Sequence, residues 1–437
     1  MSDRFINVIG AGLAGCEAAW QAARMGFKVR LYEMKPLKYT PAHSLETYAE
    51  LVCSNSFRSN SLANAVGLLK EEMRRMDSLI MKCADENMLP AGGALAVDRV
   101  HFSKAVTREI AKHPGITVIT GEVTNFPDDG ITIIATGPLT TDALSESIAR
   151  ITGRKSLYFY DAAAPIVTYE SINMDKVFLG SRYGKGTDDY INCPMDREQY
   201  DIFYDALTGA ETAQLKPFEK AILFSGCMPV ESIAQNGYDA LRFGPLKPRG
   251  LVDPRTGAMP YAVVQLRQDN VEGTLYNIVG FQTRLLWPEQ KRVFRLIPGL
   301  ENAEFVRYGV MHRNTYINSP GLLDETYEMV TRPGIYFAGQ ITGVEGYVES
   351  TSSGLVAGVN AALQCLGKEK IVFPRETAIG SLAAYVSKGA TGKFQPMNVN
   401  FGLIKAPGTR FKSKKEKYGH MVQNALRHID RIASLLP

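Results

Sequence analysis

Three glycines near the start of the chain have the spacing of a phosphate-binding turn. Gly10, Gly12 and Gly15 directly follow an apolar stretch, residues 5–9, that predicts a short strand. In such a turn the first glycine bends the chain, the second admits a pyrophosphate beside the backbone, and the third lets helix and strand pack closely. The unpaired N–H groups that open the next helix attract the anion. The motif predicts a dinucleotide bound at Gly10, Ala11, Gly12, Leu13, Ala14 and Gly15.

An acid further along extends this prediction. We expect an alanine-rich helix over residues 13–25 and a second strand over residues 28–32, followed by Glu33. A carboxylate at this position accepts hydrogen bonds from the ribose hydroxyls of FAD or NAD. The sequence has no second GxGxxG motif to hold NAD permanently. We therefore expect FAD as the resident cofactor, with NADH or NADPH as a reductant that docks transiently.

Small residues also follow two later strands. The strand expected over residues 131–135 leads into Thr136 and Gly137, and the strand over residues 334–338 leads into Gly339. Small residues at these points let a cofactor pass close to the backbone.

A helix rich in small residues is expected next, over residues 353–366, and Gly343, Gly346 and Ser350 lead into it. Its N-terminus would point positive dipole at the O2 and N1 region of a flavin and stabilise the anionic reduced form. The alternative is an ordinary strand–helix unit of the core.

Cys53 stands in a polar segment, residues 51–60, just before a long amphipathic helix expected over residues 62–86. The small hydroxyl and amide side chains of this segment suit contact with the edge of a flavin, and Arg58 could lower the pKa of a neighbouring thiol. The alternative is a capping loop with an unreactive cysteine. Cys83 continues the apolar stripe of the long helix, so we expect it to be buried.

Cys227 is the stronger candidate for a nucleophile. Residues 223–226 predict the end of a strand, and Pro229 favours the first turn of a helix that ends near Gly237. A thiol at a helix N-terminus is favoured as thiolate, which is the nucleophilic form. The alternative is a small buried side chain. We expect the remaining cysteines to be structural: Cys16, Cys193 and Cys365.

His312 and Arg313 come just before the cofactor fold resumes. An imidazole beside a guanidinium could stack on a flat anionic ligand and pin it. The alternative is a histidine with ordinary hydrogen bonds between two domains.

Positive charge is concentrated near the C-terminus. Residues 405–417 contain one acid, Glu416, and an amphipathic helix follows them. A patch of this kind can track the phosphates of a nucleic acid, although a charge run can also be a solvated face. The predicted RNA contacts are Arg410, Lys412, Lys414, Lys415 and Lys417.

The composition is that of an ordinary globular protein. The chain has 437 residues, of which 45% are hydrophobic and 22% charged, and its formal net charge is +4. The six cysteines have no CxxC or zinc-ligand spacing, which predicts reduced thiols and no metal site. The first strand begins too early for a signal peptide, and no apolar run could cross a membrane. We expect a cytoplasmic protein without a membrane contact.

The order of motifs predicts an α/β fold in which a Rossmann-like FAD-binding domain of the glutathione-reductase type is interrupted by a smaller α+β insertion. Residues 176–309 show short strands and turns but no nucleotide fingerprint, so we assign them to the insertion. Residues 1–175 and 310–437 then form the two segments of the FAD-binding domain, the second ending in the basic helix.

Six segments resemble the bacterial folate- and FAD-dependent tRNA uracil-5-methyltransferases, the TrmFO family. They are residues 8–15, 50–56, 90–99, 159–165, 226–229 and 339–347. The resemblance covers essentially the whole chain and implies transfer of a carbon from 5,10-methylenetetrahydrofolate, by way of reduced FAD, to C5 of the T-loop uridine of tRNA.

The resemblance also implies roles for individual residues. Cys227 would add to C6 of uracil, Cys53 would lie by the flavin, and His312 with Arg313 would hold the folate. The basic C-terminal residues would hold tRNA phosphates, and no obligate protein partner is expected. The cofactor contacts would include Ser54, Asn55, Val123, Thr136, Gly137, Gly339, Gln340, Gly343, Gly346 and Tyr347.

Three other functions are compatible with parts of the pattern. A related folate- and FAD-dependent family modifies the wobble uridine, but its members carry a long helical C-terminal extension. A flavin-dependent NAD(P)H oxidoreductase would need a close cysteine pair and usually a second dinucleotide domain. A non-catalytic flavin-containing RNA-binding protein would bind tRNA without transferring a methyl group.

Overall fold

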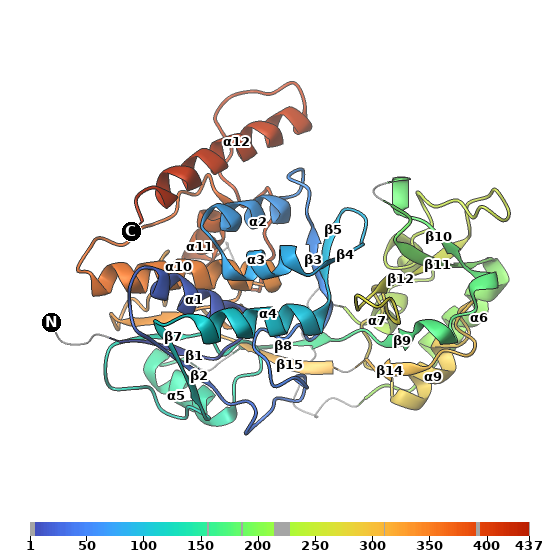
Figure 1. Cartoon of the computed structure of the whole chain (residues 1–437). Coiled ribbons are helices and arrows are strands. Elements are labelled where there is room, and N and C mark those ends of the chain that lie inside the picture. The colour runs from blue at the N-terminus through green and yellow to red at the C-terminus, as the bar shows by residue number, and fades with distance from the viewer. Residues whose placement is uncertain are drawn as a thin grey trace.

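The computed structural model describes residues 5–154, 157–184, 187–213, 228–309, 311–389 and 394–436, with the backbone alone for residues 157–162 and 311–313. These residues form two lobes, each with its own apolar core (Figure 1). The larger lobe contains both ends of the described chain, and the smaller lobe is built from its middle.

A five-stranded parallel sheet forms the centre of the larger lobe. Its strand order is β16-β7-β1-β2-β6, and every neighbouring pair is parallel. Helices cover such a sheet on both faces, so its strands are short apolar runs. This confirms the Rossmann-like fold. The strands are β1 (Ile6–Ile9), β2 (Val29–Glu33), β6 (Ile116–Thr120), β7 (Ile131–Ile134) and β16 (Ile335–Phe337).

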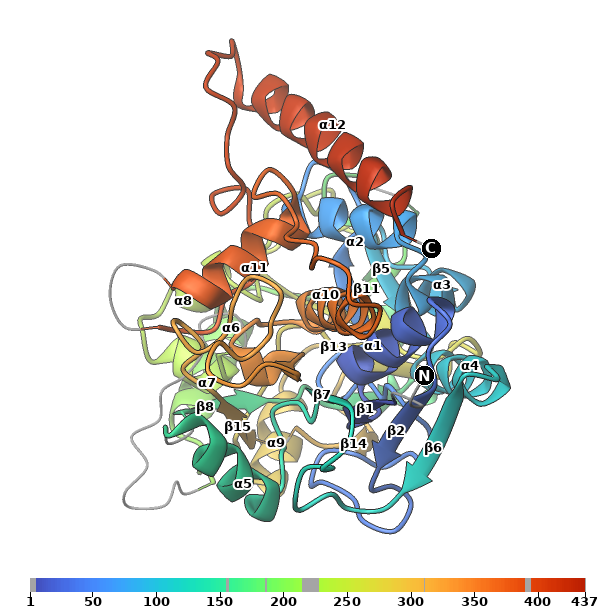
Figure 2. The ribbon, with the colours of Figure 1, turned by 90° about the vertical axis from the view of Figure 1, so that its left-hand side faces the viewer.

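Two helices that are far apart in the sequence lie side by side over this sheet: α1 (Leu13–Arg24) and α10 (Tyr347–Cys365) (Figure 2). A Cβ atom added to Gly354 would lie 2.2 Å from the carbonyl oxygen of Ala14, and one added to Gly358 would lie 2.5 Å from that of Ala18. The two glycines therefore permit the close approach. The helix expected over residues 353–366 begins earlier, because Gly346 caps it with a φ of 106°.

The single long helix expected over residues 62–86 is wrong. The structure has two helices, α2 (Ala65–Arg75) and α3 (Leu79–Glu86). Asp77 breaks the helix with a φ of 53°, and the side chain of Ser78 caps α3 by accepting a hydrogen bond from the N–H of Met81. Cys83 is buried, as expected, and so are Cys16 and Cys193.

The remaining elements of the larger lobe surround the sheet. A three-stranded antiparallel sheet has the order β3-β5-β4 and stands beside α2 and α3. Its strands are β3 (Ser56–Ser59), β4 (Met88–Leu89) and β5 (Ala94–Val97). The other helices of the larger lobe are α4 (Arg99–Lys112), α5 (Asp142–Thr152), α11 (Ala378–Lys388) and α12 (Lys414–Ala433).

The smaller lobe is a six-stranded antiparallel sheet with the order β10-β11-β12-β13-β9-β14, and its described residues add four α-helices. Along the chain, the first strand of this sheet is β9, which begins ten residues before the expected insertion edge at 176, and the last strand is β14. Its strands are β9 (Ile166–Thr168), β10 (Phe178–Leu179), β11 (Tyr190–Met195), β12 (Ala262–Gln268), β13 (Leu275–Ile278) and β14 (Phe305–Arg307). The helices are α6 (Arg197–Thr208), α7 (Val230–Ala234), α8 (Ala240–Phe243) and α9 (Trp287–Phe294).

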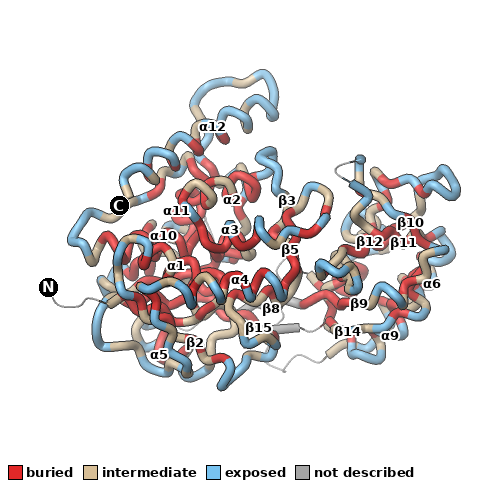
Figure 3. The backbone as a smooth tube through the Cα atoms, in the orientation of Figure 1, coloured by how far each residue is buried: buried red, intermediate tan, exposed pale blue. Residues whose placement is uncertain are grey.

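The chain leaves the larger lobe through β8 (Leu157–Ala162) and returns through β15 (Met311–Tyr316). These two strands pair with each other in antiparallel register. Buried residues run through both lobes, while exposed residues are frequent along α12 (Figure 3). None of the helices within the described ranges has the length and apolar character that crossing a bilayer requires.

Candidate functional site

The carboxyl ends of all five parallel strands open into one cavity. Its empty volume is about 1170 Å³, including its open mouth. Ligands bind at this edge in open parallel sheets because the loops that follow the strands converge there. The loops after β1, β2, β6, β7 and β16 all contribute residues to the wall, together with the first turn of α10.

The N-terminus of α1 faces this cavity without a side-chain cap. Gly12 is the N-cap residue and makes no side-chain hydrogen bond. The first N–H groups of the helix are therefore available to an anion. A Cβ atom added to Gly12 would meet nothing within 4 Å, whereas one added to Gly15 would lie 1.8 Å from the carbonyl oxygen of Gly10. Gly12 leaves room for a ligand, and Gly15 brings helix and strand together.

Glu33 closes the same end of the cavity. Its carboxylate accepts a hydrogen bond from the N–H of Ala11 at 3.0 Å and another from the N–H of Lys35 at 3.0 Å. These bonds fix the side chain in the cavity wall. Each carboxylate oxygen keeps a second acceptor position, as ribose hydroxyls require.

Twelve of the proposed cofactor residues line this one cavity. They are Gly10, Ala11, Gly12, Leu13, Ala14, Glu33, Val123, Thr136, Gly137, Gly339, Gln340 and Tyr347. An open backbone turn, an uncapped helix N-terminus and a carboxylate at the end of β2 form the donor and acceptor set that FAD requires. The residues present therefore fit FAD.

Five proposed cofactor residues stand outside the cavity lining: Gly15, Ser54, Asn55, Gly343 and Gly346. The Asn55 amide donates to the carbonyl oxygens of Val97 and Gln268 and is fully buried. A Cβ atom on Gly343 would collide with the ring of Phe394 at 2.4 Å. Asn55 and Gly343 therefore act on the shape of the site rather than on its surface.

The sequence motifs do not include residues 34–49, although this segment forms part of the wall. Lys35, Thr40 and His43 line the cavity, as do Glu50 and Val52 of the motif that follows. The Thr40 hydroxyl lies 2.6 Å from Nδ1 of His43, and burial lowers the pKa of this histidine. No spacing rule marks these residues, because the chain folds back over the cavity through an irregular loop.

Cys53 lies next to the cavity and contacts Tyr347, which lines it. The Tyr347 hydroxyl lies 3.0 Å from the Cys53 sulfur and accepts hydrogen bonds from the N–H groups of Cys53 at 2.9 Å and Ser54 at 3.2 Å. Burial raises the pKa of Tyr347 well above its ordinary value. The tyrosine therefore stays protonated and can donate to sulfur.

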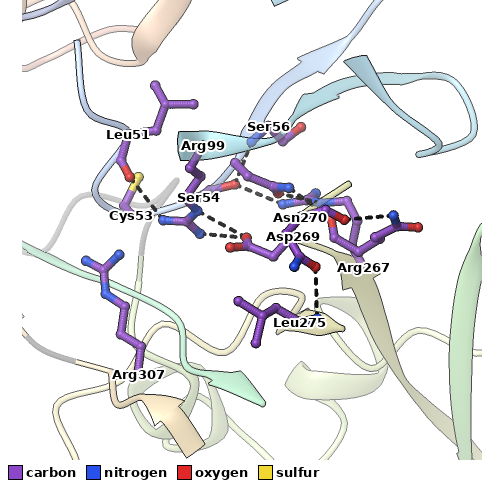
Figure 4. A network of polar contacts seen from close by, with 12 residues as sticks. Leu51, Cys53, Ser54, Ser56, Arg99, Arg267, Asp269, Asn270, Leu275 and Arg307 are labelled. Atoms are coloured by element: carbon purple, nitrogen blue, oxygen red, sulfur yellow. Dashed lines mark hydrogen bonds and ion pairs between the residues drawn. The ribbon is translucent and has the colours of Figure 1, made fainter. Parts of the chain in front are cut away.

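Three arginines hold the segment around Cys53 (Figure 4). Arg99 donates to the carbonyl oxygen of Leu51 at 3.0 Å, and Arg307 donates to that of Val52 at 2.6 Å. Arg267 donates to the side chains of Ser54 and Asn55 at 3.0 and 2.9 Å. Arg267 and Arg307 belong to the smaller lobe, so this segment is fixed by both lobes.

A buried ion pair joins the lobes at the same point. The Arg99 guanidinium donates to Oδ1 of Asp269 from two nitrogens, at 3.1 and 3.0 Å. Both side chains are at most 9% exposed. Arg58, which the sequence offered as one possible cation beside the Cys53 thiol, forms an ion pair with the buried Glu349, so a carboxylate neutralises its charge.

Cys227 lies outside the described residues. On either side of residues 214–227, the chain is anchored to the same segment of the smaller lobe. The N–H of Ala213 donates to the carbonyl oxygen of Arg284 at 2.8 Å, and the N–H of Val230 donates to that of Gln282 at 2.7 Å.

His312 and Arg313 lie on β15, where their Cα positions pair with Asp161 and Tyr160 of β8. Their side chains fall outside the described structure. The two residues therefore belong to the ribbon that connects the lobes.

The basic C-terminal residues lie at the start of α12 and in the loop before it. Lys412, Lys414, Lys415 and Arg410 are exposed, and Lys417 is half-buried. None of these five forms an ion pair with another described residue. The second half of α12 is anchored on α2, where Arg75 pairs with Asp430 at 2.6 Å. Within the described ranges there is also no group of three or more His, Cys, Asp or Glu side chains that could hold a metal ion.

Comparison with known proteins places this geometry in context. Residues 5–369 match the family described as "Glucose inhibited division protein A". A protein of Acetivibrio thermocellus named methylenetetrahydrofolate–tRNA-(uracil-5-)-methyltransferase TrmFO is 64% identical over 430 residues, which are 98% of this chain and 99% of that protein. A Bacillus subtilis protein of the same name is 59% identical over 436 residues, with 100% of each chain covered.

The fold also matches a solved structure. The GidA protein of Aquifex aeolicus, in its form I crystal, aligns with a TM-score of 0.72 and 18% sequence identity. The alignment covers 100% of this chain and 77% of that protein. At this identity the similarity concerns the fold alone.

Proposed function

The chain belongs to the glucose inhibited division protein A family, within which it is a folate- and FAD-dependent tRNA uracil-5-methyltransferase, and we propose how its residues carry out that reaction. The two relatives described above match the chain over at least 99% of their own length, and both are named methylenetetrahydrofolate–tRNA-(uracil-5-)-methyltransferase. Bound FAD supplies the redox chemistry that turns a folate methylene into a methyl group. The target we propose is the T-loop uridine, and the reductant is NADH or NADPH.

The cavity at the carboxyl ends of the parallel strands carries this proposal. The first turn of α1 holds the pyrophosphate, and Glu33 holds a ribose. Thr136, Gly137, Gly339 and Gln340 lie along the other side of the same cavity. Tyr347 belongs both to this cavity and to the hydrogen-bond network of Cys53.

Carbon 5 of uracil becomes nucleophilic only after a group adds to C6. A cysteine thiolate can form a bond to C6, which makes C5 an enolate carbon that attacks an electrophilic methylene. Loss of the C5 proton expels the nitrogen carrier of the methylene and leaves an exocyclic methylene on C5. Its reduction by a hydride that comes from NADH or NADPH by way of FAD, and elimination of the thiolate from C6, would then give 5-methyluridine. We assign the addition to Cys227 and place Cys53 at the side of the flavin, where Tyr347 holds its thiol.

The remaining assignments concern the two larger substrates. His312 and Arg313 hold the folate from the connecting ribbon. Arg410, Lys412, Lys414, Lys415 and Lys417 contact tRNA phosphates, since a cluster of cations without an ion pair to another described residue suits a polyanion. We propose that the protein acts in the cytoplasm.

The direct test is transfer of label from 5,10-methylenetetrahydrofolate to an unmodified tRNA transcript, with NADPH and FAD, followed by nucleoside analysis. We expect labelled 5-methyluridine in the T loop. A yellow protein that oxidises NADPH and labels no uridine would refute the function. Label at the wobble uridine would assign the chain to the related modification reaction.

The division of roles between the cysteines is tested by substitution. Cys227→Ala should abolish turnover and leave the bound flavin unchanged, and Cys193→Ala serves as the control because Cys193 is buried in the smaller lobe. A Cys227→Ala protein with normal turnover would remove Cys227 from the mechanism.

A further inference from the structure

We propose that Trp287 is a stacking site for an unpaired nucleobase of the RNA substrate, a role that rests on the proposed function and adds a second RNA contact on the smaller lobe. Trp287 opens α9 and is 59% exposed. It is one of two tryptophans in the chain. Large exposed aromatic rings on a protein that binds RNA are candidate platforms for bases.

Trp287 is the outer end of a column of rings. The rings of Trp287 and Tyr308 are stacked with centroids 5.3 Å apart and planes 13° from parallel. The rings of Tyr308 and Phe305 repeat this arrangement at 5.3 Å and 14°. Phe305 packs in turn on the apolar core of the smaller lobe. The core of the smaller lobe therefore holds Phe305, which is the end of the column opposite Trp287.

The column is open at its outer end. One face of the Trp287 indole lies on Tyr308, and the residue as a whole is 59% exposed, so we place the base on the side opposite Tyr308. A base placed on that side would continue the stack as its next ring. Stacking of this kind tolerates any base because each has a flat π-face.

A cation accompanies the open ring. Lys291 follows Trp287 by four residues on α9, so both lie on the same face of the helix. Lys291 is exposed and forms no ion pair with the residues that the structure describes. The neighbouring Arg292 is neutralised by Glu289 at 2.6 Å. A free ammonium beside an open ring matches a nucleotide, which combines a base with a phosphate.

The column stands next to the residues that border the cavity. Tyr308 directly follows Arg307, whose guanidinium donates to the carbonyl oxygen of Val52, a residue of the cavity wall. The N–H of Gly309 donates to the Gln290 side chain at 2.8 Å, which ties this strand end to α9. An RNA loop that enters the cavity would therefore pass the column.

The test compares Trp287→Ala with Trp287→Phe in the flavin-loaded enzyme. Trp287→Ala should raise the KM for a tRNA transcript about tenfold or more, the size of one lost base–aromatic stack. Trp287→Phe should recover most of this loss. The KM for methylenetetrahydrofolate, the flavin content and NADPH-dependent flavin reduction should stay at wild-type values.

Phe243→Ala is the matched control, since Phe243 is an aromatic residue of the same lobe with 82% exposure. A binding readout comes from Trp20→Phe, which leaves Trp287 as the only tryptophan. Its fluorescence should be quenched as the tRNA transcript is added, and Lys291→Ala should weaken that titration.

The outcomes separate the two proposals. If the wild-type enzyme methylates tRNA and Trp287→Ala leaves its KM unchanged, the stacking site is refuted and the function stands. If Trp287→Ala raises the KM for folate alone, the ring serves the pterin and our assignment is wrong. If the wild-type enzyme transfers no methyl group, the proposed function itself fails.

Discussion

The hydroxyl oxygen of Tyr347 lies 3.0 Å from the sulfur of Cys53, and the same oxygen accepts hydrogen bonds from the N–H groups of Cys53 and Ser54. A phenol oxygen has two acceptor positions and one proton. Because the two backbone N–H groups occupy the acceptor positions, the proton points to sulfur. Tyr347 thus positions the loop and donates to the thiol at the edge of the cofactor cavity.

Tyr347→Phe removes all three of these contacts. We expect the rate of methyl transfer at saturating substrate to fall about tenfold to a hundredfold, because the hydrogen bond to the sulfur is lost and two half-buried N–H groups lose their acceptor. Single-turnover assays with a matched flavin content measure the effect. Tyr204→Phe is the control, since it loses one tyrosine hydrogen bond, to the carbonyl oxygen of Ala234 in the smaller lobe. Equal rates in the two variants would leave Tyr347 without a role in positioning Cys53.

Gly12→Ala tests the phosphate-binding turn. A Cβ atom at Gly12 meets no protein atom within 4 Å but enters the cavity wall where the pyrophosphate is proposed to lie. We expect the variant to fold with unchanged apoprotein stability and to retain much less FAD after gel filtration. Gly93→Ala is matched to it, because that Cβ atom also meets nothing within 4 Å and Gly93 does not line the cavity. Full flavin retention in Gly12→Ala would move the cofactor away from this turn.

The basic C-terminal residues should act through counterion release. Replacement of Lys412, Lys414 and Lys415 by alanine should weaken tRNA binding and reduce the slope of log Kd against log salt by about two to three, since each phosphate contact contributes slightly less than one. Filter binding at several salt concentrations gives both quantities. A control that removes three other exposed lysines, Lys104, Lys112 and Lys368, should leave the slope unchanged. Identical slopes in the two triple variants would show that RNA does not contact the start of α12.

The ion pair between Arg99 and Asp269 should stabilise the junction of the lobes. Arg99→Met leaves a buried carboxylate without its partner, and we expect a loss of about 3–5 kcal/mol in the free energy of unfolding. Asp269→Asn should cost a similar amount, and the double variant less than the sum of the two. Urea unfolding of the four proteins gives the interaction energy as a double-mutant cycle. Additive losses would mean that the two side chains act independently.

Glu72 should make stability depend on pH. Its carboxylate caps α11 by accepting hydrogen bonds from the N–H groups of Ala378 at 2.7 Å and Ile379 at 2.8 Å, and burial raises its pKa to about 8. The folded protein then holds a proton that the unfolded chain releases near its ordinary pKa of 4.5. This contribution to stability is complete below about pH 4.5 and is lost as the pH rises to 8.

Glu72→Gln cannot titrate, so it separates this effect from all others. Compared with the variant, the wild-type protein should lose a few kcal/mol of unfolding free energy between pH 5 and pH 8. Thermal or urea unfolding at several pH values measures the difference. A constant difference across this range would show that Glu72 keeps its charge in the folded protein.

The sequence by itself determined the cofactor half of this protein. The glycine spacing, the apolar strand before it and the acid after the second strand are local features, because each acts through the backbone of its own turn. Residues Gly10 to Ala14 and Glu33 were therefore readable from the chain, as were the late glycine cluster and the basic start of α12. The resemblance of six segments then specified the reaction.

Only the tertiary structure decided which distant residues surround Cys53. Tyr347 and Arg307 lie more than 250 positions along the chain from the cysteine segment, at separations of 294 and 255 residues. No periodicity links such positions, since their contact depends on how α1 packs on α10 and how β8 pairs with β15. The ion pair between Arg99 and Asp269 arises in the same way, from the packing of the two lobes. The break at Asp77 and the ring column ending at Trp287 depend on packing within one lobe. A sequence motif reflects the geometry of a single turn, whereas these features depend on contacts between separate elements.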